Sequence, residues 1–166
     1  MAAKPNNAPA GFLVIVALSV VHSLGGVLCH DLAAAIPGED ACAVWRLSSR
    51  VCLIGFMCGA ASMRLNEKLV RNLLIPIVPP PLPPRLCIYV SGCMDVAAAL
   101  LLALPGGELW GATACLTMLL CVFPANIYHC ISTKAQAATR IGPPAVYYRL
   151  PIQLTFAAWA RWHVTA

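Results

Sequence analysis

The chain has 166 residues, of which 60% are hydrophobic and only 10% are charged, and its mean hydropathy is +0.79. An ordinary soluble domain is about half apolar and about a quarter charged, so this composition excludes a water-exposed surface around a normal core. The formal net charge of +5 comes from Lys and Arg residues that lie between apolar runs. That arrangement is typical of membrane topology and not of a nucleic-acid-binding patch.

Five apolar segments of helix length follow one another along the chain, at about residues 11–36, 44–65, 85–104, 108–131 and 145–163. A hydrocarbon core about 30 Å thick needs about 20 apolar residues in a helix. The pattern therefore predicts an all-α, integral membrane helical bundle with five spans. Residues 1–43 form the tail and an extra first span, and residues 44–166 form a four-helix membrane domain.

Small residues predict where the helices approach each other closely. The second span carries a GxxxG motif, and small residues also occur in pairs in the first and third spans. Such positions favour close helix packing, but they do not say whether the neighbour is another span or another chain. The residues concerned are Gly25, Gly26, Gly55, Gly59, Ser91 and Gly92.

Proline marks two further features. Residues 75–84 hold six prolines, so we expect a stiff extended segment at the membrane surface. The PxxP spacing is also that of an SH3-domain ligand, although a rigid loop packed on the bundle is the favoured interpretation. Pro124 lies inside the fourth span, where it removes one intrahelical hydrogen bond and frees the carbonyl of Leu120, which predicts a kink.

Charges and aromatic residues predict the orientation. With five spans, eight of the 11 Lys and Arg residues fall on one face and three on the other, so the N-terminus is expected on the cytosolic or matrix side. The aromatic residues sort in the same way, with the tryptophans at the less basic face and the tyrosines at the basic face. These are Trp45, Trp110, Trp159 and Trp162, and Tyr89, Tyr128, Tyr147 and Tyr148.

Asp95 is the first candidate for chemistry, because it lies near the middle of the third span. A carboxylate there costs several kcal/mol unless it is paired or protonated. The residue is either a proton or ligand site or a structural contact between helices. Arg50, about one turn inside the second span, is the expected partner, with snorkelling of its side chain to the interface as the alternative.

Four motifs resemble the DoxX family of small four-span membrane proteins over about residues 45–166. They are the Pro-rich loop ending at Pro83, the Tyr89-Val90-Ser91-Gly92 string followed by Asp95, the Phe123-Pro124-Ala125-Asn126-Ile127-Tyr128 string, and Arg149-Leu150-Pro151-Ile152-Gln153. The family usually has Glu where Asp95 stands. Many of its members also carry a His after the Gly of their first span, whereas this chain has Ala60 and Ala61 after Gly59.

The resemblance implies a four-helix core and an association with quinone-linked oxidoreductases, and it implies a polar site formed by Asp95, Asn126 and Gln153. The first span lies outside the family core. On the same grounds we expect the inner mitochondrial membrane, without support from a targeting signal.

Two functions remain open. The first is a non-catalytic accessory subunit of a larger energy-transducing membrane complex of the respiratory type, with other membrane subunits and lipid as partners. The second is a quinone-linked oxidoreductase component in which Asp95 handles a proton. Nine cysteines without a CxxC motif predict neither a metal site nor a disulfide redox centre, so no cofactor is expected beyond a bound lipid or quinone.

Overall fold

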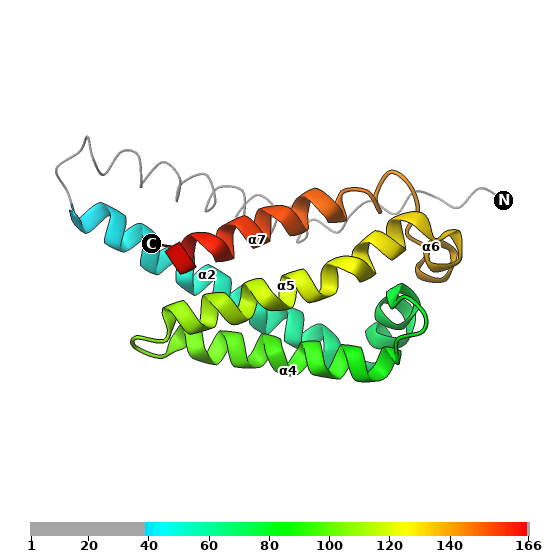
Figure 1. Ribbon diagram of the computed structural model, residues 1–166, viewed down its shortest axis with the longest axis horizontal. Helices are drawn as coiled ribbons and strands as arrows, with labels where there is room; N and C mark the ends of the chain where they lie inside the picture. Colours follow the sequence, from blue (N-terminus) through cyan, green and yellow to red (C-terminus); the bar gives the residue numbers. More distant parts are fainter. Residues whose placement is uncertain (1–38, 166) are drawn as a thin grey trace.

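The computed structural model describes residues 39–165, which form helices joined by short turns (Figure 1). The four long helices are α2 (Glu39–Leu65), α4 (Pro84–Ala103), α5 (Glu108–Ile131) and α7 (Arg149–Thr165). Shorter elements are α3 (Glu67–Leu69), the π-helical turn η1 (Val70–Leu74), the 3₁₀ turn η2 (Ile75–Ile77) and α6 (Thr133–Thr139). No strand occurs in this part of the chain, which confirms the all-α prediction.

The helix boundaries follow local sequence signals. Pro84 is the first residue of α4, where its fixed φ suits the helix and its missing N–H is not needed. A tight turn follows α4, with Gly106 at φ 75°, a conformation that favours glycine. The Ser132 hydroxyl accepts a hydrogen bond from the amide of Ala135 at 3.2 Å and so caps α6.

Two of the predicted spans agree closely with these helices. The fourth predicted span has the same bounds as α5, and the third differs from α4 by one residue at each end. Turns over residues 143–148 delay the start of α7 to Arg149, four residues later than predicted. The first predicted span, with Gly25 and Gly26, lies outside the described residues.

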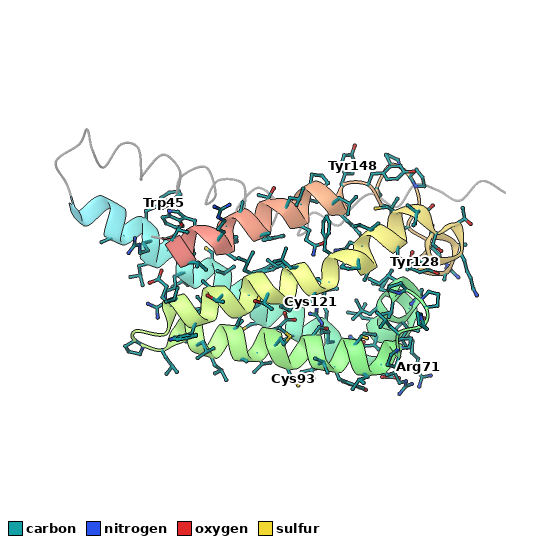
Figure 2. All side chains as sticks on the ribbon, viewed as in Figure 1. Trp45, Arg71, Cys93, Cys121, Tyr128 and Tyr148 are labelled. Carbon is teal, nitrogen blue, oxygen red and sulfur yellow. The ribbon has the colours of Figure 1, made fainter. Side chains whose placement is uncertain are left out.

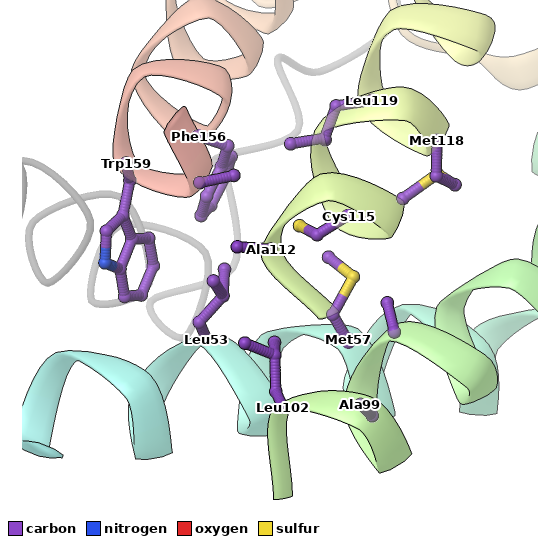
Figure 3. Packing of buried hydrophobic residues seen from close by; sticks show 12 residues of the cluster. Leu53, Met57, Ala99, Leu102, Ala112, Cys115, Met118, Leu119, Phe156 and Trp159 are labelled. Atoms are coloured by element: carbon purple, nitrogen blue, oxygen red, sulfur yellow. The ribbon is translucent and has the colours of Figure 1, made fainter. Parts of the chain in front are cut away.

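The long helices form a four-helix bundle. In sequence order α2 packs on α4, α4 on α5 and α5 on α7 (Figure 1). Side chains close the ring between α7 and α2, where the rings of Phe56 and Phe156 stack with their centroids 3.9 Å apart. The core is filled mainly by aliphatic, Met and aromatic side chains (Figure 3), including Leu53, Met57, Ala99, Leu102, Ala112, Cys115, Met118, Leu119, Phe156 and Trp159.

One glycine sets the distance between two helices. Gly111 of α5 is buried, and a Cβ placed there would lie 2.5 Å from the backbone N of Leu102 in α4. Real Cβ atoms do not approach a backbone this closely, so α4 and α5 pack at this distance only because residue 111 has no side chain.

Two of the described helices, α4 and α5, are long and apolar enough to cross a membrane. The bundle also exposes large apolar side chains on several helices, among them Val51, Leu100, Leu120 and Leu154, each more than half exposed. The five-span topology itself stays a prediction.

The two ends of the bundle differ, as the aromatic and charge patterns predict. Trp45 lies at one end, whereas Arg71, Tyr128 and Tyr148 lie at the other (Figure 2). We call the second end, which is built from α3, η1, η2, the Pro-rich segment and α6, the basic end.

The Pro-rich segment is not extended, and that expectation was wrong. Residues 75–77 form a 3₁₀ turn, and the amide of Leu82 donates to the carbonyl of Pro79 at 3.1 Å in a second turn. The segment runs from η1 to the start of α4, and its two turns let it pack against α4, α5 and α6 at the end of the bundle. It therefore lacks the extended conformation of an SH3-domain ligand.

Candidate functional site

The buried Asp95 of α4 is paired with Arg64 of α2. Its Oδ2 atom accepts a hydrogen bond from Nη1 of Arg64, and the Asp95 side chain is fully buried. The same guanidinium donates through Nε to Oγ of Ser91 at 3.0 Å and through Nη1 to the carbonyl of Ala60 at 2.9 Å. The ion pair therefore lies in a polar contact that holds α2 to α4.

The small residues Ser91 and Gly92 make room for this arginine. A Cβ on Gly92 would lie 3.1 Å from Cδ of Arg64, so the side chain of Arg64 passes directly over the glycine. The small-residue face of α4 was predicted to contact another helix. In the structure it accepts the long side chain of Arg64 from the neighbouring helix.

Arg50, the predicted partner of Asp95, binds elsewhere, so the predicted pairing is wrong. Its Nε donates to the carbonyl of Leu102 at 2.5 Å, and its Nη2 donates to the carbonyl of Leu104 at 2.7 Å. These carbonyls belong to the C-terminal end of α4, where carbonyl groups lack intrahelical hydrogen-bond donors and a cation is favoured. Arg50 therefore caps α4 at the end opposite to the basic end.

Arg64 was overlooked because it lies one residue from the end of the second predicted span. The Cα–Cβ bond of a helical residue tilts toward the helix N-terminus, so a long side chain at the end of α2 reaches back into the bundle. Its hydrogen bond to Ala60, four residues earlier, has this direction. The signal that could have identified it is therefore an arginine in the last turn, followed by an acid in the next span.

The two predicted amides, Asn126 and Gln153, do meet. Nδ2 of Asn126 donates to Oε1 of Gln153, and Nε2 of Gln153 donates to the carbonyl of Leu119 at 2.5 Å. Leu119 is next to Leu120, whose carbonyl Pro124 was predicted to free. This contact joins α5 to α7, and no hydrogen bond among the described residues links it to Asp95, so the predicted three-residue site consists of two separate contacts.

A third polar cluster lies near the other end of the bundle and was not predicted. Oγ of Ser49 is 2.9 Å from Nε2 of His163, and Nδ1 of His163 is 2.7 Å from Oε1 of Glu108. Nε1 of Trp159 donates to Oγ of Ser49 at 2.6 Å. The cluster joins α2, α5 and α7. The predicted topology could have indicated this cluster, because it brings residues 49, 108 and 163 to the same end of the bundle.

The order Ser49, His163, Glu108 is also the order of a Ser-His-acid catalytic triad. A triad serine must reach its substrate, but Ser49 is fully buried and Trp159 already binds its Oγ. The arrangement therefore holds helices together, because the polar atoms of Ser49 and His163 are bound to other atoms of the protein.

Oδ1 of Asp95 and Nδ1 of His129 are buried, and neither has a hydrogen-bond partner among the described residues. Nearby residues do not form a metal site either, since no group of three His, Cys, Asp or Glu within residues 39–165 is arranged to hold an ion. The chemistry that remains at Asp95 is thus one free carboxylate oxygen beside an arginine.

Comparison with known proteins gives one family. The model of the domain of unknown function DUF8561 matches residues 67–164, which run from the start of α3 to the last turn of α7 and exclude α2. No curated protein and no solved structure matches the chain. The DoxX resemblance gains no support from these comparisons and stays a prediction. The match spans more than half of the 166 residues, and the chain belongs to the DUF8561 family.

Proposed function

We propose that this chain is a multi-pass membrane protein that serves as a non-catalytic subunit of a larger membrane assembly. Three features support the proposal. They are the exposed apolar faces of the helices, the polar contacts between helices, and an outward glycine face on α2.

The apolar faces suit lipid or other apolar helices. Leucines and valines are exposed on α2, α4, α5 and α7, and contact of their apolar surface with water would be unfavourable. Monomeric soluble proteins rarely expose large contiguous apolar patches. A bilayer removes this difficulty, and the apolar α4 and α5 are suited to cross it.

The interior polar groups are used to hold helices together. Arg64 and Asp95 join α2 to α4, Asn126 and Gln153 join α5 to α7, and the cluster around Ser49 joins α2, α5 and α7. Such contacts between helices are common in membrane bundles, where polar groups otherwise lack partners. This use of the polar groups favours a structural role over catalysis.

The observation that carries the proposal is the outward face of α2. Gly55 and Gly59 are exposed, and a Cβ on either residue would meet no described atom within 4 Å. The exposed Leu47 and Val51 continue the same side of the helix. A GxxxG face that no described helix covers is suited to close approach by a further helix, and in this proposal that helix belongs to another subunit.

The test is gentle extraction of the native membrane, followed by native gel electrophoresis and mass spectrometry of the band. We expect the chain in a large assembly, and the double variant Gly55→Leu/Gly59→Leu should release it. The matched control is Gly142→Leu, which also fills open space but lies outside α2. The proposal is wrong if the natural chain migrates as a small species.

A second readout separates assembly from folding. Purified Gly55→Leu/Gly59→Leu should unfold at the same temperature as the natural chain, because the added side chains contact no described residue. A large loss of stability would mean that this face is an internal packing face, which contradicts the proposed role. Respiratory subunits in the same band would support the finer proposal of an energy-transducing complex in the inner mitochondrial membrane.

A quinone-linked component is the second candidate, and the free Oδ1 atom of Asp95 favours it. A buried acid without a second partner is a place where a proton or a ligand donor could bind. The test is binding of a short-chain ubiquinone analogue to the purified protein. Binding that Asp95→Asn abolishes would support this candidate, and absence of binding would dismiss it.

A further inference from the structure

Apart from the helix contacts, the basic end carries a surface hollow of about 430 Å³. Its walls come from the Pro-rich segment and from α6, which lie next to each other at this end of the bundle (Figure 1). The lining is mostly apolar and includes Pro76, Leu82, Pro84 and Ala138, together with Tyr128 and Lys134.

The hollow lies level with the ends of the two most apolar helices. Pro84 is the first residue of α4, and Tyr128 is in the last turn of α5. If these helices cross the membrane, the hollow is at the depth of the lipid headgroups. Tyrosine prefers this depth, because its ring is apolar and its hydroxyl is polar.

The charge around the hollow is strongly positive. Lys134 lines it, and four further cations are exposed at the same end, namely Lys68, Arg71, Arg85 and Arg140. Glu67 is the acid in this group, and it is bound by both Arg71 at 2.7 Å and Arg85 at 3.3 Å. Lys134 therefore faces an electrostatic environment that favours an anion.

The walls of the hollow are held in place. Nε2 of Gln136 in α6 donates to the carbonyls of His129 and Cys130 at the end of α5, at 3.2 Å and 2.9 Å. Nε2 of His129 also bonds with Oγ1 of Thr139 at 2.9 Å. These contacts fix α6 against α5, so the space beside Lys134 exists before any ligand arrives.

From this combination we propose that the hollow binds an anionic glycerophospholipid, with Lys134 holding the headgroup phosphate and the apolar walls receiving the start of an acyl chain. A small-molecule site of this size is usually apolar with a few placed polar groups. The inference rests on the membrane insertion proposed above, but it does not depend on the larger assembly.

The test is native mass spectrometry of the purified full chain, titrated with phosphatidylglycerol or with phosphatidylcholine. We expect phosphatidylglycerol to bind more tightly. Lys134→Ala should weaken its binding about fivefold, as expected for one cation near an anionic headgroup. Lys134→Arg should retain it, and Lys68→Ala, which removes an equal exposed charge at the same end, should change it less than about twofold.

Three results would overturn the proposal. They are equal binding of the two lipids, equal effects of Lys134→Ala and Lys68→Ala, and full competition by inorganic phosphate, which would identify free phosphate as the ligand. Alkaline carbonate extraction of native membranes tests the membrane insertion separately from the lipid binding. If the chain stays in the membrane while the lipid titration fails, only this inference is wrong. If carbonate releases the chain, the proposed membrane insertion is wrong as well.

Discussion

Asp95 in α4 and Arg64 in α2 form a buried ion pair across 31 residues of sequence. The Asp95 side chain is fully buried and that of Arg64 is 15% exposed. Both charges are thus removed from water, and each depends on the other for compensation.

Removing one partner of this pair should destabilise the bundle strongly. Arg64→Gln leaves a buried carboxylate without its cation, which we expect to lower the free energy of unfolding by about 3–5 kcal/mol. The measurement is denaturant unfolding of the purified chain in detergent. Lys68→Ala, which removes an exposed cation close by, should cost far less.

The double variant Arg64→Met/Asp95→Leu provides the control for this interpretation. Apolar replacements of both partners leave no unpaired charge, so most of the stability lost in Arg64→Gln should return. A double variant as unstable as Arg64→Gln would mean that the ion pair itself, and not the avoidance of a lone charge, holds α2 to α4.

Gly111→Ala should also destabilise the bundle. The new Cβ would lie 2.5 Å from the backbone N of Leu102 and would force α4 and α5 apart, at a cost of about 1–3 kcal/mol. The measurement is again denaturant unfolding. Gly55→Ala is the matched variant, since it adds the same methyl group in open space.

For Gly55→Ala we expect no loss, and a gain of up to about 1 kcal/mol from higher helix propensity. Equal losses in the two variants would contradict the close packing of α4 on α5 at Gly111.

Ser49 should not react as a catalytic nucleophile. A fluorophosphonate probe labels activated serines, but Ser49 is fully buried and bound by Trp159, so we expect no labelling of the folded chain. Ser49→Ala should instead lower stability by about 1–3 kcal/mol, because His163 loses a buried partner. The control is Ser62→Ala, which changes an exposed serine. Specific labelling of Ser49 would refute the purely structural role of this cluster.

Acid should weaken the contact around Glu67 at the basic end. A hydrogen bond from Arg71, with the charges of Arg71 and Arg85, holds the pKa of Glu67 below its ordinary value of 4.5. Because the pKa of Glu67 is lower in the folded chain, its contact with the arginines stabilises the fold above pH 4.5. This stabilisation disappears as the pH falls through the lowered pKa.

Glu67→Gln should therefore remove this part of the pH dependence and leave the rest unchanged. The effect should be small, since all three side chains are substantially exposed and screened by solvent. The check is thermal unfolding of both chains from neutral pH to below pH 4. Parallel curves over this range would exclude the contribution of Glu67.

Much of the bundle could be predicted from the order of residues. Long apolar runs between proline and glycine turns placed α4 and α5 almost to the residue, because a run of this length forms a helix in any apolar surrounding. The family resemblance placed Asn126 and Gln153 in one polar site with Asp95, and the structure brings the two amides together without Asp95.

The partners of the charged residues were not predictable in the same way. Residue counting placed Arg50 near Asp95 in depth, but counting ignores the direction of the side chain and the rotation of each helix. The structure instead directs Arg64 toward Asp95 and Arg50 toward the end of α4.

The sequence by itself determined the helical class, the positions of the long helices and the separation of the tyrosines and most basic residues from the tryptophans, because these depend on composition and local periodicity. Only the tertiary structure decided which polar groups meet, that Gly111 and not Gly55 is the close contact, and where the hollow beside Lys134 lies. Those features depend on how each helix is turned about its axis, and packing between helices sets that rotation.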